Sequence, residues 1–398
     1  MVRISGTGCS LLDYICADVD FGSAVFDSYR SREAGDGGLE PGKLVFAEDF
    51  ERFAGRPLEK ALTELTGGRE PDACNVGGPG VIALAHAAQL LGRGGDFQVD
   101  FAGAVGEDGA ASRLLDMVAA SGLDLSRYAT KPGRTPFTMV LSDPRFEGGK
   151  GERSFINEIG AAQDFGPRDL PASFFDAEIV VFGGTGLTPT MHDALDGLLA
   201  RARGKGSFTV VNTVYDFRNQ RRDPVGRWPL GSGDEAYASV DLLVADLEEA
   251  RRLSGADEAS GALEFFRSRG VGAAVVTAGT REIRAAAWKG GRFAPLAESS
   301  WPVSAAILTE LAGERGVVGD TTGCGDNFAG GLIASAAMQL AAGRSAPDLV
   351  EALAWATASG GFARFHFGGL YSESRPGEKR TLLEPYVEAW RRQVGILR

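Results

Sequence analysis

Short apolar runs alternate with longer amphipathic segments through the middle of the chain. Four of these runs are apolar at nearly every position: residues 177–182, 208–212, 240–244 and 273–277. Apolar strands separated by helical patterns indicate a parallel sheet that helices cover on both faces. Right-handed crossovers then place the carboxyl ends of the strands along one edge, where ligands bind. We therefore expect the residues that follow these strands, such as 183–186 and 212–218, to line a pocket.

The pattern elsewhere predicts further strands and helices. Residues 2–15 predict a first strand and residues 97–105 a later one. Hairpins are predicted where alternating segments flank glycines, at 135–142 with 152–158 and within 282–296. Apolar positions three and four residues apart predict helices at 50–65, 81–91, 112–120, 326–339, 349–365 and 382–394. The long segment 19–72 gives no clear order of elements beyond the helix at 50–65.

A glycine-rich stretch, residues 319–331, lies where a loop becomes the helix predicted at 326–339. Unpaired N–H groups and the positive end of the helix dipole attract anions at such a position. Gly323 and Gly325 allow the backbone to approach a ligand closely. A carboxylate at Asp326 is unexpected in a turn that only binds phosphate, because the two negative groups would repel each other. The carboxylate is explained if Asp326 takes a proton from a hydroxyl that attacks a phosphoryl group held by those amides. The alternative is a glycine-rich turn that merely starts a buried helix.

Composition excludes several classes of function. The chain has 398 residues, 44% of them hydrophobic, and a formal net charge of −12, which argues against non-specific nucleic-acid binding. No run of 18 apolar residues and no signal-peptide pattern occurs, so we expect a cytoplasmic protein without a membrane span. The four cysteines lack zinc-ligand spacing, and none of the three histidines lies near a candidate nucleophile in the sequence. There is neither a Walker A motif nor a dinucleotide-binding Gly-x-Gly-x-x-Gly after the first strand.

Residues 320–328, Asp-Thr-Thr-Gly-Cys-Gly-Asp-Asn-Phe, resemble the C-terminal signature of the ribokinase-like, or phosphofructokinase B, family of carbohydrate kinases. The family pattern usually has Ala where this chain has Cys324. The resemblance implies that Asp326 is the general base and that the amides of Gly323, Cys324 and Gly325 form the anion hole for the γ-phosphate.

Other segments in the N-terminal half resemble the same family. Gly8 and Asp13 match a Gly-x4-Asp pattern whose Asp binds substrate hydroxyls, and Gly77-Gly78 matches a glycine pair that lies against the sugar. Ile82 replaces an Asn that the family usually has four residues after that pair, which suggests a different specificity. Residues 103–109 and 151–155 also match family segments, the latter belonging to a lid.

The resemblance implies ATP and Mg²⁺ as cofactors. Asp246 and Glu249 resemble an Asn-x-x-Glu motif that organises magnesium-bound water, and carboxylates suit a hard cation. The alternative for this pair is a helix N-cap with acidic residues in the first turn. Thr277 and Gly279 match a strand end beside the nucleotide phosphates. Asp320 and Thr322 resemble the positions of the family's potassium site.

The resemblance therefore implies one ribokinase-like α/β domain over residues 1–398, a three-layer α/β/α sandwich with a mostly parallel central sheet. A small β-sheet lid is expected within residues 14–72 and 135–160, with atypical insertions at 19–72 and 299–316. The implied activity is transfer of the γ-phosphate of ATP to a hydroxyl of a sugar, sugar acid or related polyol. The alternatives are a nucleoside kinase and a catalytically silent relative that senses sugar or nucleotide. A homodimer through the lid is a further expectation, because the insertions could serve subunit contacts.

Overall fold

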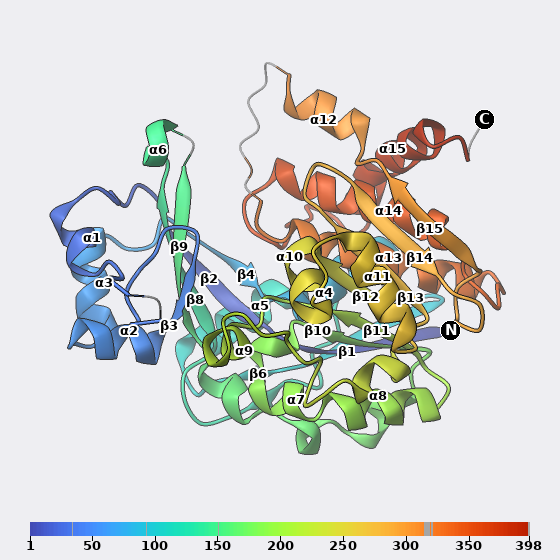
Figure 1. Ribbon diagram of the computed structural model, residues 1–398, viewed down its shortest axis with the longest axis horizontal. Helices are drawn as coiled ribbons and strands as arrows, with labels where there is room; N and C mark the ends of the chain where they lie inside the picture. Colours follow the sequence, from blue (N-terminus) through green and yellow to red (C-terminus); the bar gives the residue numbers. More distant parts are fainter. Residues whose placement is uncertain (34, 93, 150, 314–318, 320, 397–398) are drawn as a thin grey trace.

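The chain builds two sheets of different size, shown in the computed structural model in Figure 1. The model describes residues 1–33, 35–92, 94–149, 151–313, 319 and 321–396. The larger sheet has the strand order β15 (Leu296–Trp301), β14 (Ile283–Ala287), β13 (Ala273–Thr277), β12 (Leu242–Asp246), β11 (Phe208–Asn212), β10 (Ile179–Gly183), β1 (Val2–Gly8) and β5 (Phe97–Ala102). The six strands β5, β1, β10, β11, β12 and β13 pair in parallel, in that order across the sheet. At the edge beyond β13, β14 pairs antiparallel with β13, and β15 pairs antiparallel with β14. We call this sheet with its helices the body.

Apolar side chains of the body strands point alternately to two separate cores. In β10, Ile179 and Val181 belong to one core, while Val180 and Phe182 belong to the other. Both faces are therefore buried, as continuous apolar strands predict. The resulting order of helix layer, sheet and helix layer is the α/β/α sandwich expected from the sequence.

The first core lies under the helices α4 (Pro79–Leu91), α5 (Gly109–Ala119), α13 (Cys324–Ala341), α14 (Leu349–Phe362) and α15 (Glu378–Gln393). The second core lies under α7 (Pro189–Asp193), α8 (Leu195–Gly204), α10 (Leu247–Ser254) and α11 (Ala259–Ser268). Every residue of α4 from Gly80 onward is buried, because α13 and the sheet enclose it. No helix among the described residues is long and apolar enough to cross a bilayer.

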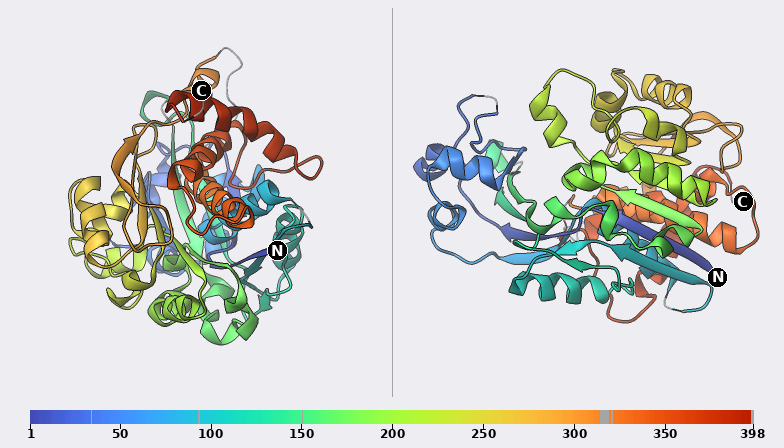
Figure 2. Two further views of the ribbon diagram at one scale, coloured as in Figure 1. Left: turned by 90° about the vertical axis from the view of Figure 1, so that its right-hand side faces the viewer. Right: turned by 90° about the horizontal axis from the view of Figure 1, so that it is seen from below.

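The smaller sheet projects from one end of the body, as Figures 1 and 2 show. Its strands follow the order β3 (Leu44–Phe46), β9 (Glu152–Glu158), β8 (Phe137–Asp143), β2 (Leu11–Cys16) and β4 (Ala73–Gly77). The helices α1 (Ala24–Ser28), α2 (Ala47–Ala54) and α3 (Leu58–Thr66) pack against it and share an apolar core with it. We call this sheet and its three helices the lid. The 19–72 segment thus supplies the edge strand β3 of the lid sheet and the three helices that pack against it.

Three sequence-based boundaries need correction. Residues 2–15 form two strands, β1 in the body and β2 in the lid, because the chain leaves the body sheet after Gly8. The helix expected at 50–65 is two helices: α2 ends at Gly55 in the left-handed conformation, and Pro57 precedes α3. The strand expected at 97–105 is divided into β5 and the short β6 (Ala104–Val105), which pairs with β7 (Ala129–Thr130).

The expected hairpins and the expected insertion have definite places. Strands β8 and β9 pair antiparallel, and the short helix α6 (Phe146–Gly149) lies at their tip; Lys150 is outside the described residues. Strands β14 and β15 form the second hairpin. The 299–316 insertion contains the end of β15 and the helix α12 (Ala305–Leu311), which packs on α14 and α15.

Candidate active site

The carboxyl ends of the parallel body strands meet at one edge, as the sequence predicts. Gly8 pairs with Gly183, and Gly183 with Asn212, in adjacent strands. Further along the edge, Asp246 of β12 lies opposite Thr277 of β13. The edge therefore brings together residues from the substrate half and the cofactor half of the predicted site. Gly279 follows Thr277 in a turn and faces open space.

Residues 321–325 of the signature, which we call the signature turn, lie at the N-terminus of α13. Gly323 is the N-cap residue, with φ +73°, and no side chain caps the helix. A Cβ atom at this position would lie 2.5 Å from the Cα atom of Gly369, so a larger residue is excluded. Cys324 and Gly325 begin the helix, at the anion-attracting end of the α13 dipole. This geometry fits the predicted anion hole.

Asp326 lies in the first turn of α13, in a half-buried position. Burial raises its pKa to about 6, and the Asn212 side chain acts in the opposite direction. The negative charges of Asp13 and Asp326 both contribute, after burial, to the raised pKa of the Cys9 thiol. The structure therefore places the predicted base and the predicted substrate-binding carboxylate both near Cys9.

The predicted acceptor residues form a compact group where the lid joins the body. Asp13, in β2, is 8% exposed and lies opposite Asn75 of β4. A Cβ atom on Gly77 would lie 2.4 Å from a carboxylate oxygen of Asp13, and Gly78 has φ +103°. The glycine pair thus lets the backbone lie directly against Asp13.

The structure shows what Ile82, which replaces the family's usual Asn, does at its position. This residue is buried in α4 and packs against Gly369, the same glycine that touches Gly323. An apolar side chain here fills space behind the signature turn and offers no hydrogen bond to a substrate. The family's usual Asn therefore has no polar counterpart at this position.

Asp246 and Glu249 form a reciprocal capping box at the start of α10. The Glu249 amide donates to Asp246 Oδ1 at 2.8 Å, and the Asp246 amide donates to Glu249 Oε2 at 3.1 Å. The Thr213 hydroxyl also donates to Glu249 Oε2, at 2.5 Å. The helix-start alternative for this pair is therefore correct as a description of its hydrogen bonds.

The electrostatics of Glu249 nevertheless fit a cation. Burial and the Asp246 charge raise its pKa to about 8, and the Asp326 charge adds to the effect. A carboxylate with such neighbours gains from a nearby hard cation. Among the described residues, no three His, Cys, Asp or Glu side chains gather as a metal-binding group, so direct coordination by a protein cage is not seen.

One charged residue at the site had no role in the sequence analysis. Arg153, in β9 of the lid, donates to the hydroxyls of Thr322 and Thr321, both at 2.7 Å. A lid guanidinium thus faces the signature loop. Residues 151–155 match a lid segment of the family, and the cationic residue at the centre of that match is the signal in the sequence that could have identified Arg153. Thr322 is engaged by this arginine, and its predicted partner Asp320 lies outside the described residues.

Two hollows of about 850 and 770 Å³ lie between lid and body. Phe46, Asp49 and Arg221 line both of them. Phe46 of the lid meets Phe217 of α9 (Phe217–Arg222) at 6.1 Å between ring centroids. An apolar cluster surrounds this contact and includes Cys9, Leu11, Leu187, Phe46, Val214 and Phe217. The hollows between lid and body are therefore bordered in part by apolar and aromatic side chains.

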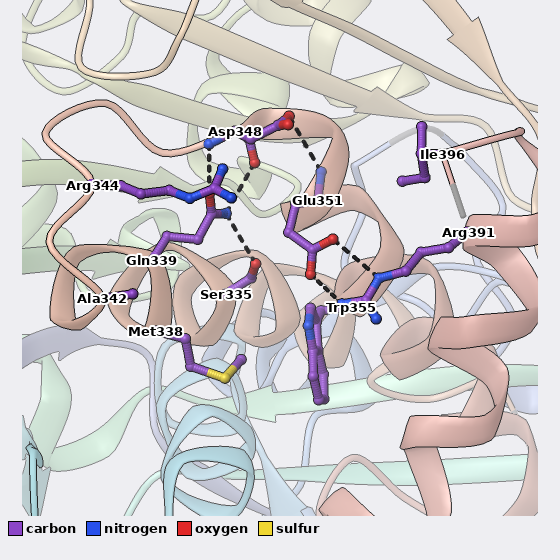
Figure 3. Close-up of a pocket in the computed structure, with 10 residues that line it drawn as sticks. All are labelled: Ser335, Met338, Gln339, Ala342, Arg344, Asp348, Glu351, Trp355, Arg391 and Ile396. Atoms are coloured by element: carbon purple, nitrogen blue, oxygen red, sulfur yellow. Dashed lines mark hydrogen bonds and ion pairs between the residues drawn. The ribbon is translucent and has the colours of Figure 1, made fainter. Parts of the chain in front are cut away.

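A third hollow, of about 480 Å³, lies at the opposite end of α13 (Figure 3). Helix α13 has 18 residues, which corresponds to roughly 27 Å between its two ends. Polar groups lining the hollow bond to one another: Arg391 pairs with Glu351, and the Gln339 amide bonds the backbone of Asp348. This hollow is remote from Asp326.

Comparisons with known proteins agree with the geometry. The model of the pfkB family carbohydrate kinases matches residues 73–375. Aminoimidazole riboside kinase of Salmonella typhimurium is 26% identical over 291 residues, which cover 72% of this chain and 82% of that protein.

Solved structures show the same fold. A probable sugar kinase from Rhizobium etli has a TM-score of 0.66 at 20% identity and covers 100% of this chain and 99% of its own. Adenosine kinase from Sinorhizobium meliloti has a TM-score of 0.66 at 18% identity, over 96% of this chain and 99% of its own. The ribokinase of Thermotoga maritima reaches 0.61 at 16% identity, over 98% and 100%. The fold is therefore ribokinase-like, and the chain belongs to the pfkB family of carbohydrate kinases.

Proposed function

We propose that this protein transfers the γ-phosphoryl group of ATP to a hydroxyl group of a sugar or sugar acid. The observation that carries the proposal is the position of Asp326. Its carboxylate, with a pKa raised to about 6 by burial, lies in the first turn of a helix whose N-terminus no side chain caps. A base and an anion-attracting turn are thus adjacent, which is the arrangement that phosphoryl transfer to an alcohol requires.

In the proposed reaction, Asp13 and the backbone of Gly77 and Gly78 hold the acceptor. Asp326 removes the proton of one acceptor hydroxyl while the oxygen of that hydroxyl forms a bond to the γ-phosphorus. The bond between this phosphorus and the β–γ bridging oxygen breaks. ADP leaves with the electron pair of that bond. The amides of Gly323, Cys324 and Gly325 offset charge on the transferred group.

The acidic pair at the start of α10 would hold Mg²⁺ through water. Glu249, whose pKa is raised to about 8, loses its proton when a cation binds nearby. Mg²⁺ supplies charge neutralisation for the nucleotide phosphates when it is bound. Thr277 and Gly279, on the neighbouring strand end, would lie beside the same phosphates.

A nucleoside is the second candidate acceptor, and the apolar cluster around Phe46 and Phe217 favours it. Phe46 borders both hollows and Phe217 one of them. Both rings belong to the same apolar cluster as Cys9 and Leu11, and Leu11 lies two residues before Asp13 in β2. A nucleobase presents a planar face that aromatic side chains bind well, whereas a free sugar presents mostly hydroxyl groups. Both acceptors present a sugar hydroxyl to Asp326, so the proposed chemistry is the same.

The test is acceptor-dependent release of ADP from ATP and Mg²⁺, measured with the purified protein against sugars, sugar acids and nucleosides. Turnover with any acceptor, abolished in Asp326→Asn, is the expected result. Saturable binding of an acceptor without turnover would replace the proposal with a sensing function. A strong preference for nucleosides over free sugars would select the second candidate.

A further inference from the structure

A lysine is buried in the body close behind the signature turn. Lys379, in the first turn of α15, has 0% exposure, and lysine is among the residues most rarely buried. Its Nζ donates to Asn327 Oδ1 at 2.9 Å and to Gln89 Oε1 at 3.0 Å. Among the described residues no carboxylate lies within ion-pairing distance of this nitrogen. Two side-chain amides therefore satisfy the buried amine.

Asn327 connects Lys379 to the signature turn by hydrogen bonds. Its Nδ2 donates to the carbonyl oxygens of Gly323 and Gly369, both at 2.8 Å. An amine next to Oδ1 fixes which way the Asn327 amide faces, because the reversed amide would set N–H groups against N–H groups. Lys379 thus selects the orientation in which Asn327 joins Gly323, the N-cap of α13, to Gly369.

The same amine supports a second connection to the neighbouring loop. Gln89, in α4, accepts from Lys379 and donates through Nε2 to the carbonyl of Tyr371 at 2.7 Å. Asn75, just before the glycine pair, donates to the carbonyl of Phe367 at 2.7 Å. Amide side chains from β4, α4 and α13 therefore hold the segment 367–371, which touches the signature turn at Gly369.

The hydrogen bonds that Lys379 donates to Asn327 and Gln89 do not depend on its charge, although its Nζ also lies over the Tyr371 ring, 5.8 Å from the centroid. Burial lowers the pKa of Lys379 to about 7, and the nearby Glu373 acts in the opposite direction. An ammonium has three N–H donors and the neutral amine has two, so either form satisfies both amide acceptors. The Lys379 charge is not among the influences on the pKa of Asp326. Any effect of Lys379 on the reaction therefore passes through geometry.

We propose that Lys379 is a positioning residue that, through Asn327, holds the signature turn in the geometry needed for phosphoryl transfer. The proposal rests on the kinase function proposed above. Holding the carbonyl of Gly323 fixes the direction of the first amides of α13, which offset charge in the transition state. Loss of the network should therefore lower kcat more than it weakens nucleotide binding.

Two variants and one matched control test the proposal. Asn327→Asp keeps an acceptor for Lys379 and removes both donors to the Gly323 and Gly369 carbonyls. Lys379→Met keeps the apolar stem and removes the amine. Leu383→Ala, one turn later in α15 and equally buried, removes core packing without touching the network. All three are compared at a temperature where each is folded by circular dichroism.

We expect Asn327→Asp and Lys379→Met to lower kcat roughly 10- to 100-fold with little change in the Kd for ADP. Leu383→Ala should lower the melting temperature and leave kcat unchanged. The variant Asn327→Ala and its combination with Lys379→Met should have the same kcat, because the proposal assigns the effect of Lys379 on kcat to its contact with Asn327 and not to its contact with Gln89. Wild-type kcat in folded Asn327→Asp or Lys379→Met, or independent effects in the double variant, would overturn the proposal.

Hydrogen exchange of the peptide 321–330 gives a readout that does not need turnover. Exchange of its amides should be faster in Asn327→Asp and Lys379→Met than in the wild type and Leu383→Ala. If the wild type has no acceptor-dependent turnover, the kinase function fails while this measurement still decides whether the network holds the turn. Equal exchange in all four proteins would overturn the proposal.

Discussion

Two helix N-termini meet at the carboxyl edge of the body sheet, and they use their carboxylates differently. At the start of α10, Asp246 and Glu249 bond to each other's backbone amides in a capping box. At the start of α13, the N-cap is Gly323 and no side chain caps the helix, although Asp326 lies within its first turn. Both ends carry acidic residues close to where a phosphate is expected.

The difference separates a carboxylate that stabilises its own helix from one that is available for chemistry. The oxygens of Asp246 and Glu249 are engaged by their own amides and by Thr213. Asp326 does not cap its own helix, and burial raises its pKa to about 6, which suits it to accept a proton at neutral pH. The presence of acid residues at a helix start therefore does not by itself define a catalytic group.

The largest expected effect tests this distinction directly. Asp326→Asn should lower kcat by roughly 10²- to 10⁴-fold, because the amide cannot take the acceptor proton, while nucleotide binding persists. Asp246→Asn is the matched control at the other helix, because asparagine also caps a helix well. Steady-state kinetics and calorimetric binding of ADP provide the measurements. Near-wild-type kcat in Asp326→Asn would contradict the assignment of the base.

Arg153 faces the open helix end from the lid, so removing its charge should be the next largest change. Arg153→Gln should lower kcat/KM roughly 10- to 100-fold, because a cation beside the anion-binding turn is lost. Arg145→Gln is the control: Arg145 follows lid strand β8 and pairs with Asp18 and Asp143 rather than with the turn. Equal kinetics of the two variants would show that Arg153 only fastens the lid to the Thr321 and Thr322 hydroxyls.

The pH dependence of kcat/KM tests the assignment of Asp326 as the base. Asp326 must be ionised to act as a base, so kcat/KM should be level above its pKa and fall as pH drops through about 6. Below that value the loss should approach roughly tenfold per pH unit. The Asp326→Asn variant should lack this acidic limb. A wild-type profile that stays flat well below pH 6 would contradict the raised pKa.

Glu249 should have a smaller effect, and one that depends on magnesium. Because its pKa is raised to about 8, a cation competes with a proton, and the apparent KM for Mg²⁺ should fall as pH rises toward 8. Glu249→Gln should weaken activity several-fold at low Mg²⁺ and little at saturation. The measurement is a magnesium titration at two pH values. An unchanged titration would leave Asp246 and Glu249 as a capping box alone.

Cys324→Ala should change phosphoryl transfer least of all. The turn uses the backbone N–H of this residue, and alanine supplies the same group. Alkylation of the wild type should inhibit and ATP should protect, because an adduct at the helix N-terminus would occupy the phosphate site. Residual activity after alkylation of both proteins is the readout. Equal inhibition would assign the effect to Cys9, Cys16 or Cys74, and an inactive alanine variant would give the thiol a chemical role.

Much of the fold and of the site was predictable, because apolar periodicity and a compact motif are local properties. The strand at 208–212 and the strand at 273–277 agree with β11 and β13 to the residue. The motif 320–328 placed Asp326 at a helix start, where the structure has it. The cofactor and metal roles of Thr277, Gly279, Asp320 and Thr322 stay predictions.

Other features depended on contacts between distant residues. The division of residues 2–15 into β1 and β2 follows from two different partner sheets, which one strand pattern cannot distinguish. Arg153 lies 169 positions before Thr322, its partner across the cleft. Lys379 meets Gln89 across 290 positions, and nothing near Lys379 in the sequence predicts its burial. The expected homodimer through the lid also stays a prediction.

The apolar core inside the lid has a consequence for how this chain could have diverged. Phe21, Phe26 and Phe50 are buried among α1, α2, α3 and the lid strands, apart from both cores of the body. A segment that supplies its own interior can be lengthened or exchanged without forcing mutations elsewhere. Its surface facing the cleft carries Phe46, Arg153 and Phe155. Acceptor preference could therefore drift by changes within this one module, provided that Arg153 keeps its contact with the signature turn of the body.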